Sequence, residues 1–226
     1  MPRPTRQFLD GGLYHVLNRG NGRSLIFYKD RDFLAFLRIL AQGAERFGVD
    51  VLCWCLMSNH WHLVLRPRRG SDLSRLMQWI GVTHVRRHHS HYHTRGGGHI
   101  YQGRFKSFPV QSDEHFLTLC RYVEANPRRA RLVKRAELWR WSSLGYATTD
   151  GLKAPQSAWP IDRPRGWTRM VNEPINEKEL SRLSLSLERG SPFGDDRWSE
   201  RIAKQTGLSS KLRPLGRPRK IKKSAG

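Results

Sequence analysis

The chain has 226 residues and a formal net charge of +22, with 41 Lys and Arg against 19 Asp and Glu. This length allows one domain of ordinary size with roughly seventy or eighty residues left over. The charge favours nucleic acid as the partner, because each neutralised phosphate releases condensed counterions. On charge alone, a basic ribosomal protein or a protein of a membrane surface is the alternative.

No stretch reaches the ~18 consecutive apolar residues of a transmembrane helix, and residues 1–10 have no apolar core of signal-peptide length. We therefore expect no membrane partner and a cytoplasmic, nucleoid-associated location in a bacterium. The cysteines Cys53, Cys55 and Cys120 are an odd number in a chain without an export signal. We expect them to be buried thiols rather than disulfides.

The spacing of apolar residues changes between strand-like and helix-like periods along the chain. In chain order it first predicts a half-buried strand at 12–18, a helix capped by Asp30 and stopped by Gly48, and strands at 49–57 and 60–65. A helix capped by Ser71 follows and continues into a histidine-rich stretch at 86–93. An extended segment at 99–110 and a helix from Ser112 to Pro127 complete the order. This order predicts an α/β (α+β) fold, a ferredoxin-like antiparallel sheet with helices packed on one face.

The chain is expected to divide near residue 150. Residues 1–150 hold the elements of the α/β domain, whereas 151–226 form a looser extension with amphipathic segments at 176–188 and 195–206. From Arg201 to the end there are nine Lys or Arg and no acidic residue, which indicates an electrostatic arm.

Two histidines on one predicted strand are the first candidates for chemistry. Side chains alternate along a strand, so His60 and His62 project from one side and Trp61 from the other. Two adjacent imidazoles make half a metal site, although a histidine pair on a strand more often binds nothing. A zinc site shared with Cys53 and Cys55 lacks the usual ligand spacing.

The predicted helix before Pro127 supplies the second set of candidates. Tyr122 and Asn126 are four residues apart and therefore point the same way. Asn126 precedes the proline, which places it in the last helical turn, where its amide oxygen can reach an ion. Two imidazoles and one amide oxygen suit Mg²⁺ or Mn²⁺ better than a closed zinc site. Taken alone, Tyr122 would more often be an aromatic side chain at the helix edge with its hydroxyl in water.

These two segments resemble one known family. Residues 57–65 are similar to the His-hydrophobic-His strand of the HUH transposases, and residues 121–130 to the tyrosine helix of the REP-associated tyrosine transposases, which carry an IS200-like domain. Further segments that resemble this family are 14–16, 19–21, 26–27 and 102–105, with Trp198, 206–208, 212–214 and 216–220 near the end. Ser58 stands where the family usually has proline, and Arg131 where it often has glycine.

The resemblance implies an enzyme that nicks DNA and transfers the strand. Residues 1–150 would be its HUH tyrosine transposase domain, with Tyr122 as nucleophile and His60, His62 and Asn126 as ligands of Mg²⁺ or Mn²⁺. A phenol is a weak nucleophile at neutral pH, so it needs a phosphate polarised by a cation. The expected partner is single-stranded or hairpin DNA, attached during the reaction through a 5′-phosphotyrosine link. The long C-terminus favours a monomer over a homodimer.

Several basic side chains are candidates for DNA contacts. They are Arg19, Arg66, Arg68, Arg69, Arg86, Arg87, Arg104, Lys106, Arg128, Arg129, Arg217, Arg219 and Lys220. The arginines at 66–69 and 128–131 are expected to border the proposed site. The segment at 216–218 resembles a hook that inserts arginine into a minor groove. The histidines between 84 and 99 are expected to be a polar, solvated or DNA-facing surface, and Trp139 and Trp141 to belong to the core.

Two other functions account for part of the pattern. A regulator derived from such a nuclease would keep the basic surface and lose cleavage, but all four site residues are present. A basic RNA-binding protein would explain the charge and not the arrangement of Tyr122 with the histidines.

Overall fold

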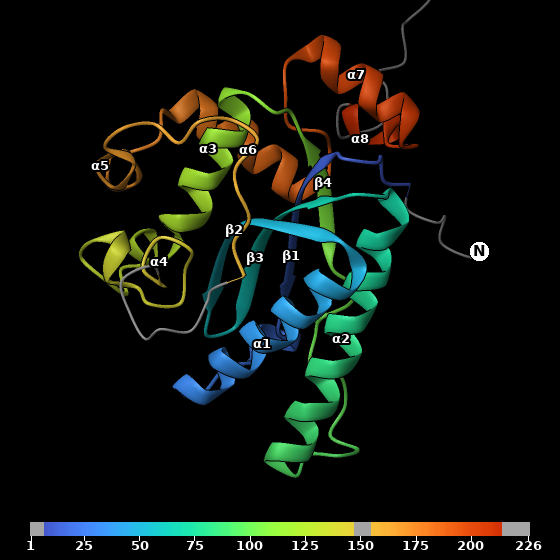
Figure 1. Cartoon of the computed structure of the whole chain (residues 1–226), viewed down its shortest axis with the longest axis vertical. Helices are drawn as coiled ribbons and strands as arrows, with labels where there is room; N and C mark the ends of the chain where they lie inside the picture. Colours follow the sequence, from blue (N-terminus) through green and yellow to red (C-terminus); the bar gives the residue numbers. More distant parts are fainter. Residues whose placement is uncertain (1–6, 147–154, 214–226) are drawn as a thin grey trace, which may run out of the picture.

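The computed structural model describes residues 7–146 and 155–213 and has a four-stranded sheet at its centre (Figure 1). The strands are β1 (Leu13–Arg19), β2 (Val49–Met57), β3 (His60–Pro67) and β4 (Lys106–Val110). The helices are α1 (Asp30–Phe47), α2 (Gly70–Tyr92), α3 (Glu114–Glu124), α4 (Asn126–Arg129), α5 (Trp167–Asn172), α6 (Glu177–Arg189), α7 (Asp196–Gln205) and α8 (Ser209–Leu212), with short 3-10 turns at Asn21–Arg23 and Ala136–Leu138.

The sheet has the strand order β2-β3-β1-β4, and each neighbouring pair is antiparallel. With α1 between β1 and β2 and α2 between β3 and β4, this is the ferredoxin-like topology, so the predicted fold class is confirmed. In the register of β1 with β3, Leu17 lies opposite His62 and Arg19 lies opposite His60. This register places a basic side chain beside the histidine pair.

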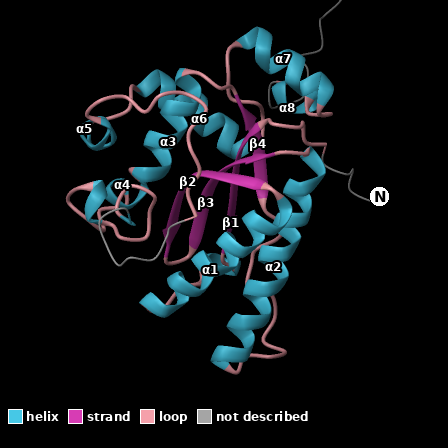
Figure 2. Ribbon diagram, viewed as in Figure 1, coloured by secondary structure: helices cyan, strands magenta, loops and turns pink. Residues whose placement is uncertain are grey.

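Helices cover both faces of the sheet rather than the single face expected (Figure 2). One face carries Tyr14, Trp61 and Leu63 and packs under α1 and α2. The other carries Val64 and Phe108 and packs against α3. The first four residues of β1, 13–16, are buried on both sides and not half-buried, because the strand lies between β3 and β4 with helices above and below, while its last three residues are partly or fully exposed.

The helix starts differ from those expected. α1 begins at Asp30, but Lys29 occupies its N-cap position. α2 begins at Gly70, whose backbone N–H donates to Asp10 Oδ1 at 2.7 Å, so Ser71 is not the cap. The carboxylate comes from sixty residues earlier in the chain, and a local sequence pattern cannot reveal such a partner.

The stretch between α2 and β4 also differs from expectation. Of the predicted extended segment 99–110, only the last part forms β4, while Tyr101 makes an isolated bridge with Gly20. His84 is not part of a solvated surface: it is 4% exposed, and its Nδ1 lies 2.7 Å from the Tyr101 hydroxyl. It faces the core because it continues the apolar stripe of α2 from Ile80.

The C-terminal part of the described chain packs on the same core. The predicted amphipathic segments are confirmed as α6 and α7. Trp167, Leu183 and Phe193 join the hydrophobic cluster under α3. The division of the chain near residue 150 remains a prediction. No helix in residues 7–146 and 155–213 is long and apolar enough to cross a bilayer.

The remaining expectations about buried side chains hold. Cys53, Cys55 and Cys120 are free and buried, as predicted. Trp141 is 3% exposed and lies in the core, and Trp139 packs beside it while its Nε1 donates to the Leu56 carbonyl at 2.9 Å. The two tryptophans therefore serve the fold.

Candidate active site

One cavity brings the four predicted site residues together. His60, His62, Tyr122 and Asn126 line a hollow of about 650 Å³ between the sheet, the end of α3 and α6. The other described residues that line it are Leu17, Asn18, Arg19, Gln102, Gly103, Arg104, Lys106, Ser184, Leu187 and Glu188. Side chains from opposite ends of the chain therefore share one space.

The histidine pair projects from β3 toward α3. The imidazole centroids of His60 and His62 lie 5.1 Å apart. Burial, aided by the charge of Arg19, lowers the pKa of His60 to about 4. Burial, followed by the influence of His15 and His60, holds the pKa of His62 well below its usual range. Both rings are therefore neutral at neutral pH and keep a lone pair available for a cation.

His15 supports His62 from the neighbouring strand and was missed as a site residue. It lies fully buried in β1, with its Nε2 at 2.9 Å from His62 Nδ1. His60 has a comparable partner, since its Nδ1 lies 2.6 Å from Asn59 Oδ1. In both rings Nδ1 is within hydrogen-bonding distance of a neighbouring side chain, so Nε2 is the nitrogen that can bind a ligand in the cavity. Only the pairing of β1 with β3 reveals His15, because nothing in the local sequence links it to His62.

Tyr122 faces the histidines from α3. Its ring lies edge-on to His62, with centroids 6.0 Å apart and planes at 81°. The Arg129 guanidinium carbon lies 4.2 Å from the centroid of the tyrosine ring, a cation–π contact. The nucleophile candidate thus sits between a neutral imidazole and a fixed positive charge.

Asn126 lies beside His62, but not in the last turn of the tyrosine helix. α3 ends at Glu124, and Asn126 is the first residue of the separate helix α4. Pro127 causes the break because it has no N–H to donate to the preceding turn. The backbone stays close to helical across the break, so Asn126 Nδ2 still lies 3.2 Å from His62 Nε2. A half-turn of the carboxamide would present its oxygen to the same space.

These donors fit a divalent cation. The two Nε2 atoms belong to neutral rings, and the amide of Asn126 contacts His62 from the side of α3. An open cavity beside them leaves room for phosphate oxygens and water.

A buried carboxylate holds the tyrosine helix in place. Glu124 is fully buried and accepts hydrogen bonds from Ser143 Oγ at 2.5 Å and Trp167 Nε1 at 2.6 Å. The pKa of Glu124 is raised by burial, against the hydrogen bonds and the charge of Arg163, 3.8 Å away. This network joins α3 to the loop before residue 146 and to α5.

Some predicted DNA-contact residues lie at the cavity. Arg19, Arg104 and Lys106 line it, and Arg129 lies over Tyr122. Arg128 is half-buried on α4. The cavity therefore has a positive wall on the side of β1 and β4, where a phosphate backbone would find cations.

Other predicted contacts lie elsewhere. Arg66, Arg68 and Arg69 do not border the site. Arg66 lies near the far end of β3, roughly 20 Å from His60 at about 3.3 Å per strand residue, and Arg68 and Arg69 follow the strand. Arg66 is paired with Asp50 at 2.8 Å. These arginines were expected at the site because they come soon after the histidines in the sequence. Along an extended strand, however, residues a few positions apart lie far apart in space.

Arg86 and Arg87 lie on the far half of α2, away from the cavity. Arg86 is exposed, and Arg87 lines a separate hollow of about 400 Å³ between α1 and α2 with Arg31 and Arg38. The predicted contacts Arg217, Arg219 and Lys220 lie outside the described residues.

The wall formed by α6 was not foreseen. Ser184, Leu187 and Glu188 close the cavity opposite the sheet. The sequence shows only an amphipathic helix here, and its polar face carries no mark of a site. Glu188 brings a carboxylate to a cavity whose other charged lining residues are basic.

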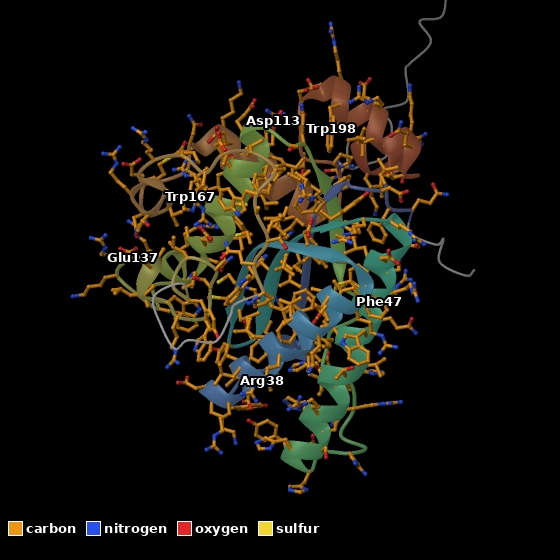
Figure 3. The ribbon with its side chains drawn as sticks, viewed as in Figure 1. Arg38, Phe47, Asp113, Glu137, Trp167 and Trp198 are labelled. Atoms are coloured by element: carbon orange, nitrogen blue, oxygen red, sulfur yellow. The ribbon has the colours of Figure 1, made fainter. Side chains whose placement is uncertain are left out.

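In the described part of the chain, one group of three His, Cys, Asp or Glu side chains could share an ion, namely Asp113, Glu114 and His115. It lies at the start of α3, the opposite end of that helix from Tyr122 (Figure 3). Asp113 Oδ1 accepts from the His115 backbone N–H at 2.9 Å and lies 2.8 Å from His115 Nδ1. Within this group Asp113 caps the helix.

The chain is similar to known proteins in sequence and in fold. The profile of the family described as "Transposase IS200 like" matches residues 10–126, which are 117 of the 226 residues. A search of curated protein sequences found no match. The solved structure of a REP-associated tyrosine transposase bound to a REP hairpin is 18% identical, covers 78% of this chain and 100% of that chain, and has a TM-score of 0.54. That likeness supports the fold.

A second solved structure, of a protein from Deinococcus radiodurans R1 assigned as a transposase, is 15% identical over 58% of this chain and 92% of that chain. Its TM-score of 0.39 is too low to carry an argument. The family profile, in contrast, runs from the start of β1 through Asn126 and includes the histidine strand and the tyrosine helix. On this match the chain belongs to the IS200-like transposase family.

Proposed function

We propose that the protein is a metal-dependent endonuclease and transposase that cleaves and rejoins single-stranded DNA through Tyr122. The observation that carries the proposal is the meeting of His60, His62, Tyr122 and Asn126 in one basic cavity. These side chains come from three separate elements, β3, α3 and α4, so chance clustering of common residues is a poor explanation. Neither a regulator nor an RNA-binding protein requires this arrangement.

The metal ligands would be Nε2 of His60, Nε2 of His62 and the amide oxygen of Asn126. When bound, Mg²⁺ or Mn²⁺ supplies Lewis-acid polarisation of a phosphate oxygen. The neutral state of both imidazoles supports this role, because a protonated ring cannot bind a cation. Asn59 and His15 hold the rings with Nε2 toward the cavity.

Tyr122 would act as the nucleophile. Its oxygen attacks the phosphorus of a phosphodiester, a 5′-phosphotyrosine bond forms, and the bond from phosphorus to the 3′-oxygen breaks. The phenolic proton is released and the departing 3′-oxygen takes up a proton, so the step is a balanced transesterification. The 3′-hydroxyl can later attack the phosphotyrosine and rejoin the strand without an external energy source.

Arg19, Arg104 and Lys106 would bind the phosphates next to the scissile one. DNA in a hairpin is the favoured substrate, since the structural neighbour is described as bound to a REP hairpin. One chain carries the nucleophile and every proposed ligand within one cavity, which supports a monomer as the active unit.

We extend the proposal to the organisation of the chain. Residues 1–150 would form the catalytic domain. Residues 151–226 would form an extension that closes the cavity through α6 and adds a basic tail for DNA.

The test is covalent capture. The full chain is incubated with a labelled single-stranded hairpin DNA and Mg²⁺ or Mn²⁺, and a denaturing gel is examined for a protein–DNA adduct. Tyr122→Phe should abolish the adduct, whereas Tyr28→Phe, a change at an exposed tyrosine, should keep it. An adduct formed by Tyr122→Phe would contradict the proposed nucleophile. Tight DNA binding by the wild-type protein without any adduct would favour the regulator.

A further inference from the structure

A second cavity lies directly beside the proposed active site. It has a volume of about 500 Å³, within the range of small-molecule sites, and is enclosed by α2 and the segment at 101–105 that leads into β4. In Figure 1 this segment returns alongside α2 toward the sheet. Building on the proposed function, we propose that this cavity receives one unpaired base of the DNA strand whose phosphates occupy the catalytic cavity.

The floor of the cavity is aromatic and has no polar group left to satisfy. Trp61 Nε1 donates to the Tyr101 hydroxyl at 3.0 Å, and that hydroxyl lies 2.7 Å from His84 Nδ1. Trp61 and Tyr101 are nearly buried, at 1% and 9% exposure. These two rings close the bottom of the cavity, while the half-buried ring of Phe105 offers aromatic carbon on which a nucleobase can stack.

The walls leave space along α2. A Cβ added at Gly81 would meet no atom within 4 Å, and the neighbouring Val82 is 44% exposed although it is apolar. Met77, Val85 and Phe105 complete the apolar lining. A flat, largely apolar group can enter here without displacing a side chain.

The rim supplies hydrogen-bonding groups and little charge. Ser74 and Gln78, both exposed on α2, bring a hydroxyl and an amide to the edge of the cavity. These groups can donate to and accept from the edge of a base. Among the described lining residues Arg104 alone is charged. A free nucleotide would bring its phosphates into this cavity, where Arg104 alone could not neutralise them. A base that is part of a strand leaves its phosphate outside the cavity.

The two cavities open on opposite faces of the sheet and meet at the end of β1 and the segment at 101–105. Asn18, Gly103 and Arg104 line both of them. Asn18 Nδ2 donates to the Gly103 carbonyl at 3.2 Å, which fixes the partition between the cavities. A strand bound to Arg19 and Arg104 can therefore keep its backbone in the basic cavity and turn a neighbouring base into the apolar one.

The experiment measures equilibrium binding without cleavage. Full-length Tyr122→Phe protein is titrated by fluorescence anisotropy with two probes, a twelve-nucleotide oligothymidylate and an abasic deoxyribose-phosphate chain of the same length. Gly81→Leu in the same background should weaken binding to oligothymidylate about tenfold and leave binding to the abasic probe unchanged, because one stacked base is lost. Ser90→Leu, a matched change at an exposed position on α2 outside this cavity, should alter neither.

A second measurement does not depend on the folding of the Gly81 variant. An oligothymidylate carrying 4-thiothymidine is photocrosslinked to Tyr122→Phe protein, and the expected attachment is to a peptide within 74–85 or 101–105. Crosslinks elsewhere alone, or equal loss of both probes in a folded Gly81→Leu protein, would contradict the base site and leave the proposed function standing. A Tyr122→Phe protein that binds neither probe would contradict both.

Discussion

His15 Nε2 lies 2.9 Å from His62 Nδ1, and the two rings stack with centroids 5.1 Å apart and planes at 29°. The pairing of β1 with β3 creates this contact between residues 47 positions apart. Binding of a cation through Nε2 of His62, which faces Asn126, requires the tautomer in which Nδ1 of His62 donates to His15 Nε2. His15 is thus a positioning residue for the proposed metal ligand.

Replacement of His15 should weaken metal binding. We expect His15→Leu to lower the affinity for Mn²⁺ by about 10–100-fold, because His62 loses the acceptor that fixes its tautomer. Isothermal titration calorimetry of the full chain measures this directly. His15→Gln retains an acceptor and should recover part of the affinity. Unchanged Mn²⁺ affinity in a folded His15→Leu protein would show that His15 does not orient the ligand.

The network around Glu124 should contribute strongly to stability. Glu124→Ala leaves the Ser143 hydroxyl and the Trp167 indole N–H buried without their acceptor. Each unsatisfied group costs about 1–3 kcal/mol, so the free energy of unfolding should fall by roughly 3 kcal/mol. Glu124→Gln keeps one acceptor oxygen and should lose less. Urea denaturation measures both, with the exposed Glu114→Ala as control, expected within about 0.5 kcal/mol of wild type. Equal stability of the Glu124 and Glu114 variants would refute this prediction.

The turn after α4 carries a correctable strain. Arg131 has a φ of 59°, in the left-handed region, which explains why glycine suits this position. Because that conformation costs a non-glycine residue about 1–2 kcal/mol, Arg131→Gly should stabilise the protein by roughly 0.5–1 kcal/mol after the entropy of glycine is counted. Thermal denaturation tests this. Arg128→Gly, within α4, should instead destabilise; a lower melting temperature for Arg131→Gly would contradict the prediction.

Acid should unfold the protein at a pH set by its buried histidines. Burial lowers the pKa of His15 and His84 to about 3 and that of His60 to about 4. As the pH falls below about 6.5, the unfolded chain binds protons that the native protein does not, so stability is lost between about pH 6.5 and 3. The pKa of His62 is also held well below its usual range by burial, so four such groups give a slope of about 5 kcal/mol per pH unit near pH 5.

A substitution can identify the contribution of a single histidine to this pH dependence of stability. His84→Gln should reduce the slope by about one quarter, since one of the four groups no longer titrates. The exposed His99→Gln serves as control and should leave the slope unchanged. Urea denaturation at several pH values between 4 and 7 gives the slopes, and identical slopes for the two variants would rule out His84 as a contributor.

The local pattern of the sequence determined the elements and the fold class. Apolar periodicity placed β2, β3, α1 and α6 within a few residues of their observed bounds, since side-chain alternation depends only on the local backbone. The strand order could then be inferred from the order of the elements. Helix caps were less predictable, because the partner of Gly70 is Asp10, a residue of another segment.

The sequence by itself also brought His60, His62, Tyr122 and Asn126 forward as one candidate site, through residue chemistry and through the resemblance of two short motifs. Tertiary structure alone decided what surrounds them. Strand register added His15, the packing of α6 added Glu188, and the direction of β3 removed Arg66 from the site. The physical reason is that residue type and the spacing of apolar residues can be read directly from consecutive positions of the sequence. Which elements lie next to each other depends instead on how the whole chain packs.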